Sequence, residues 1–327
     1  MKNLFLSISI FCITCFPVIG QIVDSTLWQV GGGAVNTMLK DGNTMYLGGS
    51  FTSVSSNTGC FSVLNESQIK PALNKFQLTP GVVYAIISDE NGGWFIGGDF
   101  VLSKGGKTFN DLLHVQANGE VDLNFAFTTS SNSSVKALYL RNKRLYVGGK
   151  FTSFGAQYRT NIAEIDLNSG QVTTWNPTAN NDVNAIAGKD SRLYIGGLFT
   201  NLNGQAVNQL ACIDLDLGIS TNFKPVLAGG NVNTLMVFDS LLYVGGTFTS
   251  INSQPRNRIA AFRMGSGNLD DWNPDANSSV NALAASGTKI YAGGDFTSIG
   301  GFGYNRLVAL DKTSGAALPW VPNPDGS

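Results

Sequence analysis

A short pattern of apolar and small residues recurs six times along the chain. In Leu145–Ser153, three apolar residues are followed by two glycines, one variable residue and a phenylalanine. The corresponding segments begin at Met45, Trp94, Leu193, Leu242 and Ile290. Their phenylalanines are Phe51, Phe100, Phe151, Phe199, Phe248 and Phe296, so successive copies are 48 to 51 residues apart. Six copies at nearly constant spacing indicate tandem repeats of one structural unit.

Each repeat contains four short segments with the composition of β-strands. Residues 145–149, 161–166, 172–177 and 183–186 illustrate the four types, which are rich in β-branched and aromatic residues. Turn-forming residues separate them, as at 155–157, 168–170 and 189–191. No stretch shows a sustained helical period. The pattern therefore predicts an all-β protein with a helix content near zero.

The apolar runs also predict how the sheets pack. Leu145–Val147 and Leu241–Val244 are continuous apolar runs, which are typical of a sheet covered on both faces. Four antiparallel strands in a unit of this length match one blade of a propeller, where neighbouring blades cover both faces. We therefore predict a six-bladed β-propeller of four-stranded antiparallel blades.

The paired glycines have a structural explanation within this architecture. They end an apolar strand where the backbone bulges or approaches a neighbour closely. A phosphate-binding loop would need glycines that lead into the N-terminus of a helix. Here they lead into Phe151–Ser153 and a turn, so we exclude that function.

The predicted domain organisation is a leader followed by one propeller. Residues 1–20 begin with Lys2, contain an apolar run too short to span a bilayer and end at Gly20. This is typical of a secretory signal peptide cleaved before Gln21. Residues 21–327 form the propeller, with repeats at about 34–80, 81–134, 135–181, 182–230, 231–278 and 279–327.

The fourth-strand segments outnumber the complete repeats. Trp28 lies just before the first repeat, in the way that Trp175 lies just before the fourth. Because the sixth repeat also ends in a fourth-strand segment, around Trp320, there is one fourth-strand segment more than there are repeats. Either Trp28 belongs to an irregular leader, or the protein continues past Ser327 into further repeats or a surface-sorting domain. The sequence favours continuation slightly, because residues 322–326 are typical of a loop between blades.

Composition and net charge restrict the kinds of partner that the protein can bind. Apolar residues make up 43% and charged residues 13% of the chain, which is enough apolar material for a large core. The net charge of −1 offers no basic field for nucleic acid or an anionic membrane. After residue 20 no segment is long and apolar enough for a membrane span. Cys60 and Cys212 are too few and too far apart for a disulfide-stapled scaffold.

The chain resembles a known repeat family. Asn118–Phe125, the segment Val135–Leu138 and the Gly-Gly-x-Phe-Thr strand together resemble the bacterial delta-60 repeat, a propeller family of unknown function found on secreted proteins. The resemblance extends from about Asp24 to the end of the chain. It implies a propeller fold and an extracellular or cell-surface setting, and it implies no reaction.

A second resemblance concerns the outer strand. Ala163–Gly170 leading to Trp175, and Leu310–Gly315 leading to Trp320, look like the tryptophan-docking repeats of quinoprotein dehydrogenases. The tryptophan comes one residue later than in that pattern, and the adjacent cysteine pair of those enzymes is absent from the sequence. We interpret the likeness as shared packing, with an outer tryptophan set against the next blade.

Three types of chemistry-bearing residue fit structural roles. His114 is the single histidine, so a multi-histidine metal site is excluded, and we expect a packed or edge histidine rather than a catalytic one. Cys212 fits a buried strand position. Asp166, Asp214 and Asp311 precede turns, where capping is the favoured role over calcium binding because a full oxygen ligand set is missing. We expect no metal site and no cofactor.

Two polar sets recur with the repeat. Arginines follow the repeat phenylalanine by eight or ten residues. This spacing indicates that each arginine pairs with a turn carboxylate or a carbonyl, or that the arginines form a ligand-binding ring. They are Arg159, Arg256, Arg258 and Arg306. Asparagines follow the valine that starts the channel-lining strand; they are Asn36, Asn184, Asn233 and Asn281. These asparagines either cap the turn before the strand or form a polar ring at one mouth of the channel. Tyr84 and Lys136 take their place in repeats two and three.

The sequence favours binding over catalysis. A single histidine, two isolated cysteines and no paired carboxylates outside the repeat pattern predict a non-catalytic extracellular binding or scaffolding module, with an unknown protein or carbohydrate as its partner. Repeats one and two depart most from the others, so we expect the partner-facing surface there. The alternatives are a glycan-active or quinone-dependent propeller enzyme, and a structural spacer within a larger surface protein.

Overall fold

The computed structural model describes most of the chain. The described residues are 30–31, 33–41, 44–54, 56–57, 61–65, 68–72, 76–78 and 81–319. They contain β-strands and turns and no helix, so the all-β prediction is confirmed for this part of the chain. It follows that no helix among these residues is long and apolar enough to cross a membrane. The predicted signal peptide, Trp28, Cys60 and Trp320 lie outside the described residues.

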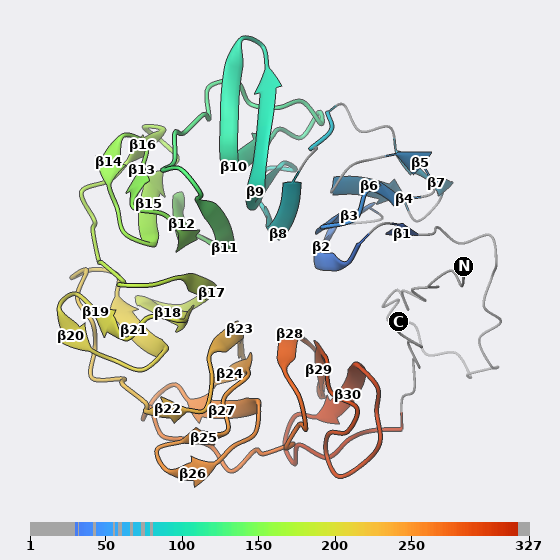
Figure 1. The fold of residues 1–327 in the computed structure, drawn as a ribbon, viewed down its shortest axis with the longest axis vertical. Helices are drawn as coiled ribbons and strands as arrows, with labels where there is room; N and C mark the ends of the chain where they lie inside the picture. Colours follow the sequence, from blue (N-terminus) through green and yellow to red (C-terminus); the bar gives the residue numbers. More distant parts are fainter. Residues whose placement is uncertain are drawn as a thin grey trace.

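Six antiparallel sheets follow one another around a central axis (Figure 1). Their innermost strands are β2 (Val35–Asp41), β8 (Gly81–Ser88), β11 (Ser134–Arg141), β17 (Val183–Lys189), β23 (Val232–Phe238) and β28 (Val280–Ser286). The second strands are β3 (Thr44–Gly49), β9 (Trp94–Lys104), β12 (Arg144–Lys150), β18 (Arg192–Gly197), β24 (Leu241–Gly246) and β29 (Lys289–Gly294). The third strands are β6 (Phe61–Asn65), β10 (Lys107–Val115), β15 (Ile162–Asp166), β21 (Leu210–Asp214), β27 (Ile259–Arg263) and β30 (Leu307–Asp311). This order within each sheet is the one that the repeat pattern predicts.

The fourth strand is shorter than the sequence suggests. Fourth strands are present in the first and third sheets, as β7 (Gln68–Ala72) and β16 (Gln171–Val172). In the other four sheets an isolated bridge replaces it; the bridges are Val115 to Val121, Ile213 to Ser220, Phe262 to Leu269 and Leu310 to Ala317. In repeats three to six the outer segment soon reaches a proline, which has no N–H to continue the ladder. Those prolines are Pro177, Pro225, Pro274 and Pro319.

Short strand pairs extend the connection between the second and third strands in four of the described repeats. They are β4 (Ser53–Val54) with β5 (Ser56–Asn57), β13 (Ser153–Phe154) with β14 (Gln157–Tyr158), β19 (Asn201–Leu202) with β20 (Gln205–Ala206), and β25 (Ser250–Ile251) with β26 (Gln254–Pro255). Two further strands, β1 (Val30–Gly31) and β22 (Leu227–Ala228), pair with β4 and β25. The hairpins therefore lie within single repeats, whereas β1 and β22 precede the innermost strands β2 and β23.

Every innermost strand bulges immediately after a valine near its start. In β11, for example, Val135 pairs with Gly149 and Ala137 pairs with Gly148, so Lys136 between them is left without a partner in the ladder. The same register shift occurs in β2, β8, β17, β23 and β28. A bulge turns the strand and re-aims the extra side chain. The residues on these bulges are Asn36, Tyr84, Lys136, Asn184, Asn233 and Asn281.

The first glycine of each pair receives a valine from the next sheet. A Cβ on any of five such glycines would lie 2.2 to 2.8 Å from a valine Cγ1. The glycines are Gly48, Gly97, Gly148, Gly196 and Gly245, and the valines are Val83, Val135, Val183, Val232 and Val280. All five valines are fully buried. We call this arrangement the glycine–valine contact; it is the close approach to a neighbour that the sequence predicts.

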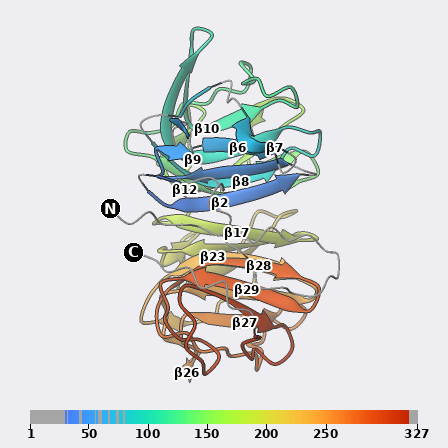
Figure 2. The ribbon, with the colours of Figure 1, turned by 90° about the vertical axis from the view of Figure 1, so that its right-hand side faces the viewer.

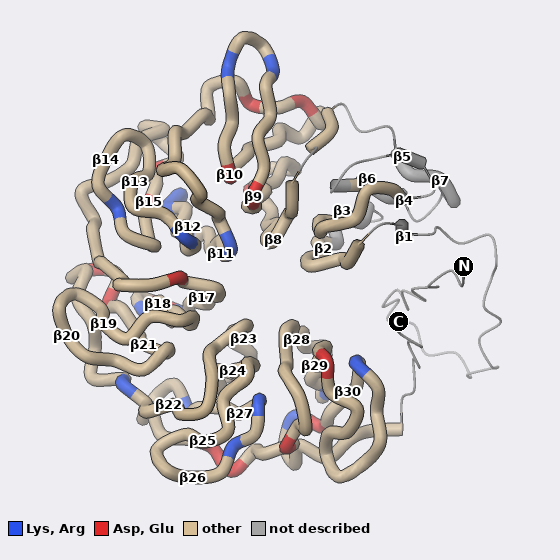
Figure 3. The backbone as a smooth tube through the Cα atoms, in the orientation of Figure 1, with Lys and Arg blue, Asp and Glu red and all other residues tan. Residues whose placement is uncertain are grey.

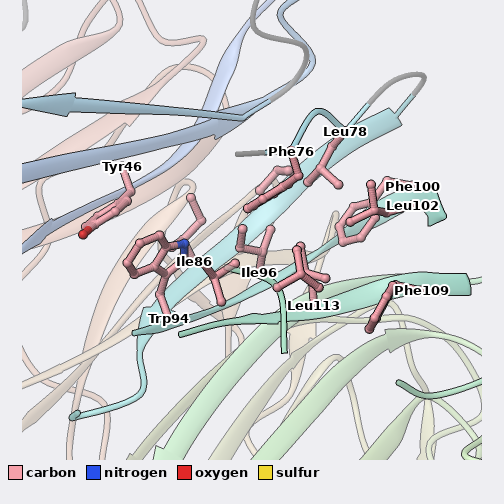
Figure 4. Close-up of a cluster of buried hydrophobic side chains, with 13 residues drawn as sticks. Tyr46, Phe76, Leu78, Ile86, Trp94, Ile96, Phe100, Leu102, Phe109 and Leu113 are labelled. Carbon is pink, nitrogen blue, oxygen red and sulfur yellow. The ribbon is translucent and has the colours of Figure 1, made fainter. Parts of the chain in front are cut away.

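The core is divided among the spaces between successive sheets. Five apolar clusters each combine side chains of two neighbouring repeats. Figure 4 shows the first cluster, where Tyr46 of the first sheet meets Trp94 of the second with ring centroids 4.2 Å apart. Phe100 and Leu113 extend the cluster outward. Each sheet is therefore held mainly by its two neighbours.

We predict that the glycine–valine contact is a sensitive position for stability. In Gly196→Ala the new Cβ would lie 2.3 Å from Val232 Cγ1, so the substitution should lower the free energy of unfolding by about 1–3 kcal/mol. Gly293→Ala is the matched control, because the nearest atom to its Cβ would be 3.7 Å away and the change should be within about 0.5 kcal/mol. Urea denaturation of both variants measures the difference. Equal destabilisation of the two would contradict the role of the contact.

Candidate functional site

The bulge residues bind the next repeat along the ring. Asn36 Nδ2 donates to the carbonyl of Val83 at 3.1 Å, and Asn184 Nδ2 donates to that of Val232 at 3.2 Å. Asn233 Nδ2 donates to Asn281 Oδ1 at 2.8 Å. The predicted asparagines thus form hydrogen bonds between sheets on the channel side. The bulge aims these side chains at the next repeat.

Charged groups complete the polar contacts beside the channel. Lys136 Nζ binds Asp182 Oδ2 at 2.7 Å and Asn184 Oδ1 at 3.3 Å, and Figure 3 shows basic residues on β11 and β12. Asn281 Nδ2 donates to Asp295 Oδ2 at 3.1 Å. The hydrogen bonds from Ser279 and Asn281 hold the pKa of Asp295 below its usual range. The polar groups of neighbouring repeats therefore satisfy one another, and the set forms a series of structural bonds.

His114 lies between two carboxylates in the second repeat. Its Nε2 is 3.1 Å from Asp89 Oδ2, and its Nδ1 is 3.0 Å from Asp122 Oδ2. The ring stacks on Phe95 with centroids 4.5 Å apart, and the edge of Phe125 lies 5.5 Å away. The ring therefore joins the turn between β8 and β9, which carries Asp89, to the outer segment that carries Asp122.

Asp89 also organises the turn between β8 and β9. Its Oδ1 accepts the backbone N–H groups of Asn91 and Gly93, both at 2.7 Å. Burial alone would raise the pKa of Asp89, but the hydrogen bonds from Asn91, His114 and Gly93 lower it below its usual value. The carboxylate is therefore a structural acceptor that links the turn to the third strand.

Other residues that the sequence singles out have structural partners. Asp166 Oδ1 accepts the N–H of Asn168 at 2.9 Å, and the Asp214 and Asp311 carboxylates bind their own turns in the same way. Arg159 donates to the carbonyl of Thr173 in the outer segment of its own repeat. Burial raises the pKa of the Cys212 thiol to about 11, as expected for a cysteine packed in the core.

A pocket of about 290 Å³ lies between the third and fourth sheets. The turn between β11 and β12 forms one side, the outer segment of repeat three forms a second, and the turn after β21 forms a third. Its lining residues are Arg141, Asn142, Arg144, Tyr146, Glu164, Trp175, Leu215 and Asp216. Two aromatic rings therefore meet two guanidinium groups and two carboxylates in one concave place.

Interactions within the pocket hold its charged groups in position. Arg144 Nη1 lies 3.4 Å from Glu164 Oε1 and 3.3 Å from Asp166 Oδ2. Thr173 Oγ1 donates to Glu164 Oε1 at 2.9 Å. Burial, followed by the nearby Glu164 carboxylate, raises the pKa of Tyr146 well above its usual value. The Tyr146 hydroxyl therefore stays protonated over the physiological range.

The docking of the outer tryptophan differs between repeats. Trp272 is buried and its indole N–H donates to the carbonyl of Asp311 in the next repeat at 3.0 Å. Trp175 is half-buried, contacts Tyr146 edge-on at 5.3 Å, and its indole nitrogen has no hydrogen-bond partner in the described part of the chain. Trp175 therefore lacks the hydrogen bond to the next repeat at the place where the pocket lies.

Sequence reasoning missed this pocket, although one position carries a signal for it. In the third strand the residue opposite the repeat aromatic is Cys212, Ala261 or Ala309 in repeats four to six. In repeats two and three the same position holds His114 and Glu164. A titratable group at a position otherwise occupied by small residues marks both polar clusters.

Comparisons with known proteins support the fold. A family model described as a domain of unknown function (DUF5122) beta-propeller matches residues 188–217 and 241–271. No curated protein sequence matches the chain. The extracellular domains of the hybrid two-component systems BT4673 and BT3049 from B. thetaiotaomicron are similar in structure, with TM-scores of 0.58 and 0.56 and 14% identity each.

The extent of these likenesses limits what they show. They cover 89% and 88% of this chain, which spans only 34% and 35% of those two proteins. The computationally designed protein Ika8 is also similar, with a TM-score of 0.51, 13% identity and coverage of 88% of this chain and 87% of that one. At these identities the likeness shows the fold alone, which is all-β and propeller-like. The prediction of an all-β, propeller-like fold is confirmed for the described residues.

We predict that Asp89 stabilises the protein in a pH-dependent way. Because its pKa is lowered on folding, the carboxylate contributes stability above its unfolded pKa of about 3.9, and loses it as the pH falls through the folded value. Asp89→Asn should therefore lower the free energy of unfolding by about 1–3 kcal/mol at pH 7, and the deficit should shrink below pH 4. Urea titrations across this range measure it.

Asp190→Asn in the exposed turn between β17 and β18 is the control, and it should change stability little at either pH. A deficit for Asp89→Asn that stayed constant from pH 7 to pH 3 would contradict the electrostatic role.

Proposed function

We propose that the chain is an extracellular, non-catalytic binding propeller whose six sheets are six blades, and that the pocket between the third and fourth sheets binds a saccharide. The observation that carries the proposal is the convergence of Tyr146 and Trp175 with Arg141, Arg144 and Asp216 around one concave space. Small-ligand sites combine apolar or aromatic walls with a few polar groups that fix orientation.

The chemistry of the lining favours a neutral, hydroxyl-rich ligand. Aromatic rings offer flat apolar surface to the faces of a sugar ring. Guanidinium groups donate hydrogen bonds and carboxylates accept them, so a hydroxyl group can meet both kinds of partner. Arg144 is already paired with Glu164 and Asp166, which reduces its attraction for an anion. A saccharide therefore fits this lining better than a phosphate or a carboxylate does.

The structural roles of the acidic residues support binding without turnover. Glu164 is buried and engaged by Arg144 and Thr173. His114 lies in another repeat, between Asp89 and Asp122. The predicted signal peptide supports an extracellular setting, and two of the structurally similar proteins are described as extracellular domains.

A protein contact at the second repeat is a second candidate function. There β9 and β10 form one long hairpin that projects from the rim, with basic residues at its tip (Figures 1 and 3). Val101 in this hairpin is 55% exposed. The hairpin lies in the part of the chain where the sequence predicts a partner-facing surface, and a rigid projecting hairpin is suited to contact with a protein.

The pocket predicts a localised loss of binding. A glycan array identifies the ligand, and isothermal titration calorimetry then measures its affinity for the chain and its variants. Arg141→Ala should weaken binding about tenfold, since it removes hydrogen-bond donors from the pocket wall. Lys189→Ala changes the matching position of the next repeat, outside the pocket, and should leave the affinity unchanged.

Two results would overturn the proposal. Equal weakening by Arg141→Ala and Lys189→Ala would show that the pocket is not the site. Release of cleaved sugar by the unmodified chain, abolished in Glu164→Gln, would show that the module is an enzyme.

A further inference from the structure

Among the described residues, the ring of sheets leaves an interval on one side. Innermost strands pack in sequence, β2 on β8, β8 on β11, β11 on β17, β17 on β23 and β23 on β28. Figure 1 shows a wide interval between β28 and β2. Viewed from that side, β17 on the opposite part of the ring is visible between β2 and β28 (Figure 2). We call the interval between the sixth and first sheets the open sector.

The sixth sheet has the glycine of a glycine–valine contact on the side of this sector, but no valine among the described residues packs on it. A Cβ on Gly293 would have no neighbour closer than Ala282 Cβ of its own sheet, at 3.7 Å. Gly293 is partly exposed, whereas the five equivalent glycines are buried. Ala282 and Ala284 on the same face are exposed, and Leu307 is half-buried where Ile162 and its other equivalents are fully buried.

The first sheet has the valine of such a contact on its side of the sector, but no glycine among the described residues receives it. Val35 is partly exposed, although the valines that start the other five innermost strands are fully buried. Three residues later, Met38 is 54% exposed, whereas its equivalents Ile86 and Leu138 are 5% and 7% exposed. Two apolar side chains that normally pack against the preceding sheet therefore have none to contact in the described part of the chain.

The rim strand β1 occupies the position that, in a later repeat, belongs to the connection arriving from the preceding sheet. Val30 pairs with Val54 as Leu227 pairs with Ile251. Strand β22, which contains Leu227, follows the outer segment of repeat four and leads into repeat five. Strand β1 leads into the first repeat in the same way, so the chain approaches the first sheet from the position of another sheet.

We propose that the open sector is a seventh position of the ring, and that it takes one further repeat of the same type joined after the sixth sheet. The valine of this repeat would pack on Gly293, and its first paired glycine would receive Val35 and Met38. Both faces of the sector are thus continuations of a contact already made five times. This inference is independent of saccharide binding.

The geometry disfavours two other occupants. Direct closure would place Val35 against Gly293, and in the structure the Cβ position of Gly293 has only atoms of its own sheet nearby, so that contact is not made. A second copy of the chain would have to enter the sector with a whole ring, because Gly293 and Val35 flank the same interval. One four-stranded repeat matches the two surfaces.

The test extends the chain by a copy of its own repeat. A copy of residues 232–279 placed after Ser327 brings its valine eight residues past Trp320, the distance that separates Val280 from Trp272. The probe is Met38→Cys, whose modification by a thiol reagent is followed by peptide mass spectrometry with and without the added repeat. The added repeat should slow modification at position 38 by about tenfold or more, since access controls thiol reactivity. Thermal unfolding of the extended chain should also shift upward.

Gly293→Val is the matched control. It should leave the unextended chain folded, because the position is open, and it should abolish the protection given by the added repeat. Unchanged modification on extension, or protection that survives Gly293→Val, would overturn the proposal.

Two further measurements identify the other occupants. An oxidised Val35→Cys, Gly293→Cys chain that forms a disulfide without extension would show direct closure. Protection of position 38 that rises with concentration, together with a dimer in light scattering, would show a second copy. Either result would overturn the proposal.

Discussion

The packing of a valine against a glycine is the contact on which the rest of this structure depends. At each of five places the missing side chain lets the next sheet approach until its valine is fully buried. A larger residue at the glycine would push the two sheets apart and open the apolar cluster behind it. Because the contact joins the second strand of one repeat to the first strand of the next, the spacing of the whole ring follows from it.

Polar side chains occupy two places that this packing leaves available. On the channel side, the bulge aims one side chain per repeat at the following sheet, as Asn184 does toward Val232. Farther out, the position opposite the repeat aromatic holds Glu164 or His114 in two repeats. The channel-side groups bind the next sheet, whereas Glu164 and His114 bind partners within their own repeats. Function can therefore vary in these positions while the apolar packing stays the same.

The repeat, the all-β fold and the close approach at the glycines were all predictable, because they follow from residues near each other in sequence. The paired glycines predicted either a bulge or a close approach to a neighbour, so the bulge itself was only one of two options. The direction in which the side chains of Asn36 and its equivalents point could therefore not be predicted. The partners of His114 lie 25 and 8 residues away and meet through a turn and an outer segment. The pocket depends on how deeply Trp175 sits, which no local pattern specifies. In repeats four to six the prolines after the outer segment indicate a short fourth strand, but the second repeat has only a bridge and no such proline.

The division of the core into five clusters, each shared by two neighbouring sheets, has a consequence for unfolding. Among the described residues no apolar cluster spans the centre, so each sheet is stabilised almost entirely by its nearest neighbours. Cooperativity in such a molecule resembles that of a linear array, in which the terminal units have one neighbour and fray first. A ring without ends has no terminal unit. The same glycine–valine contacts would then give a single cooperative transition in place of stepwise loss from either end.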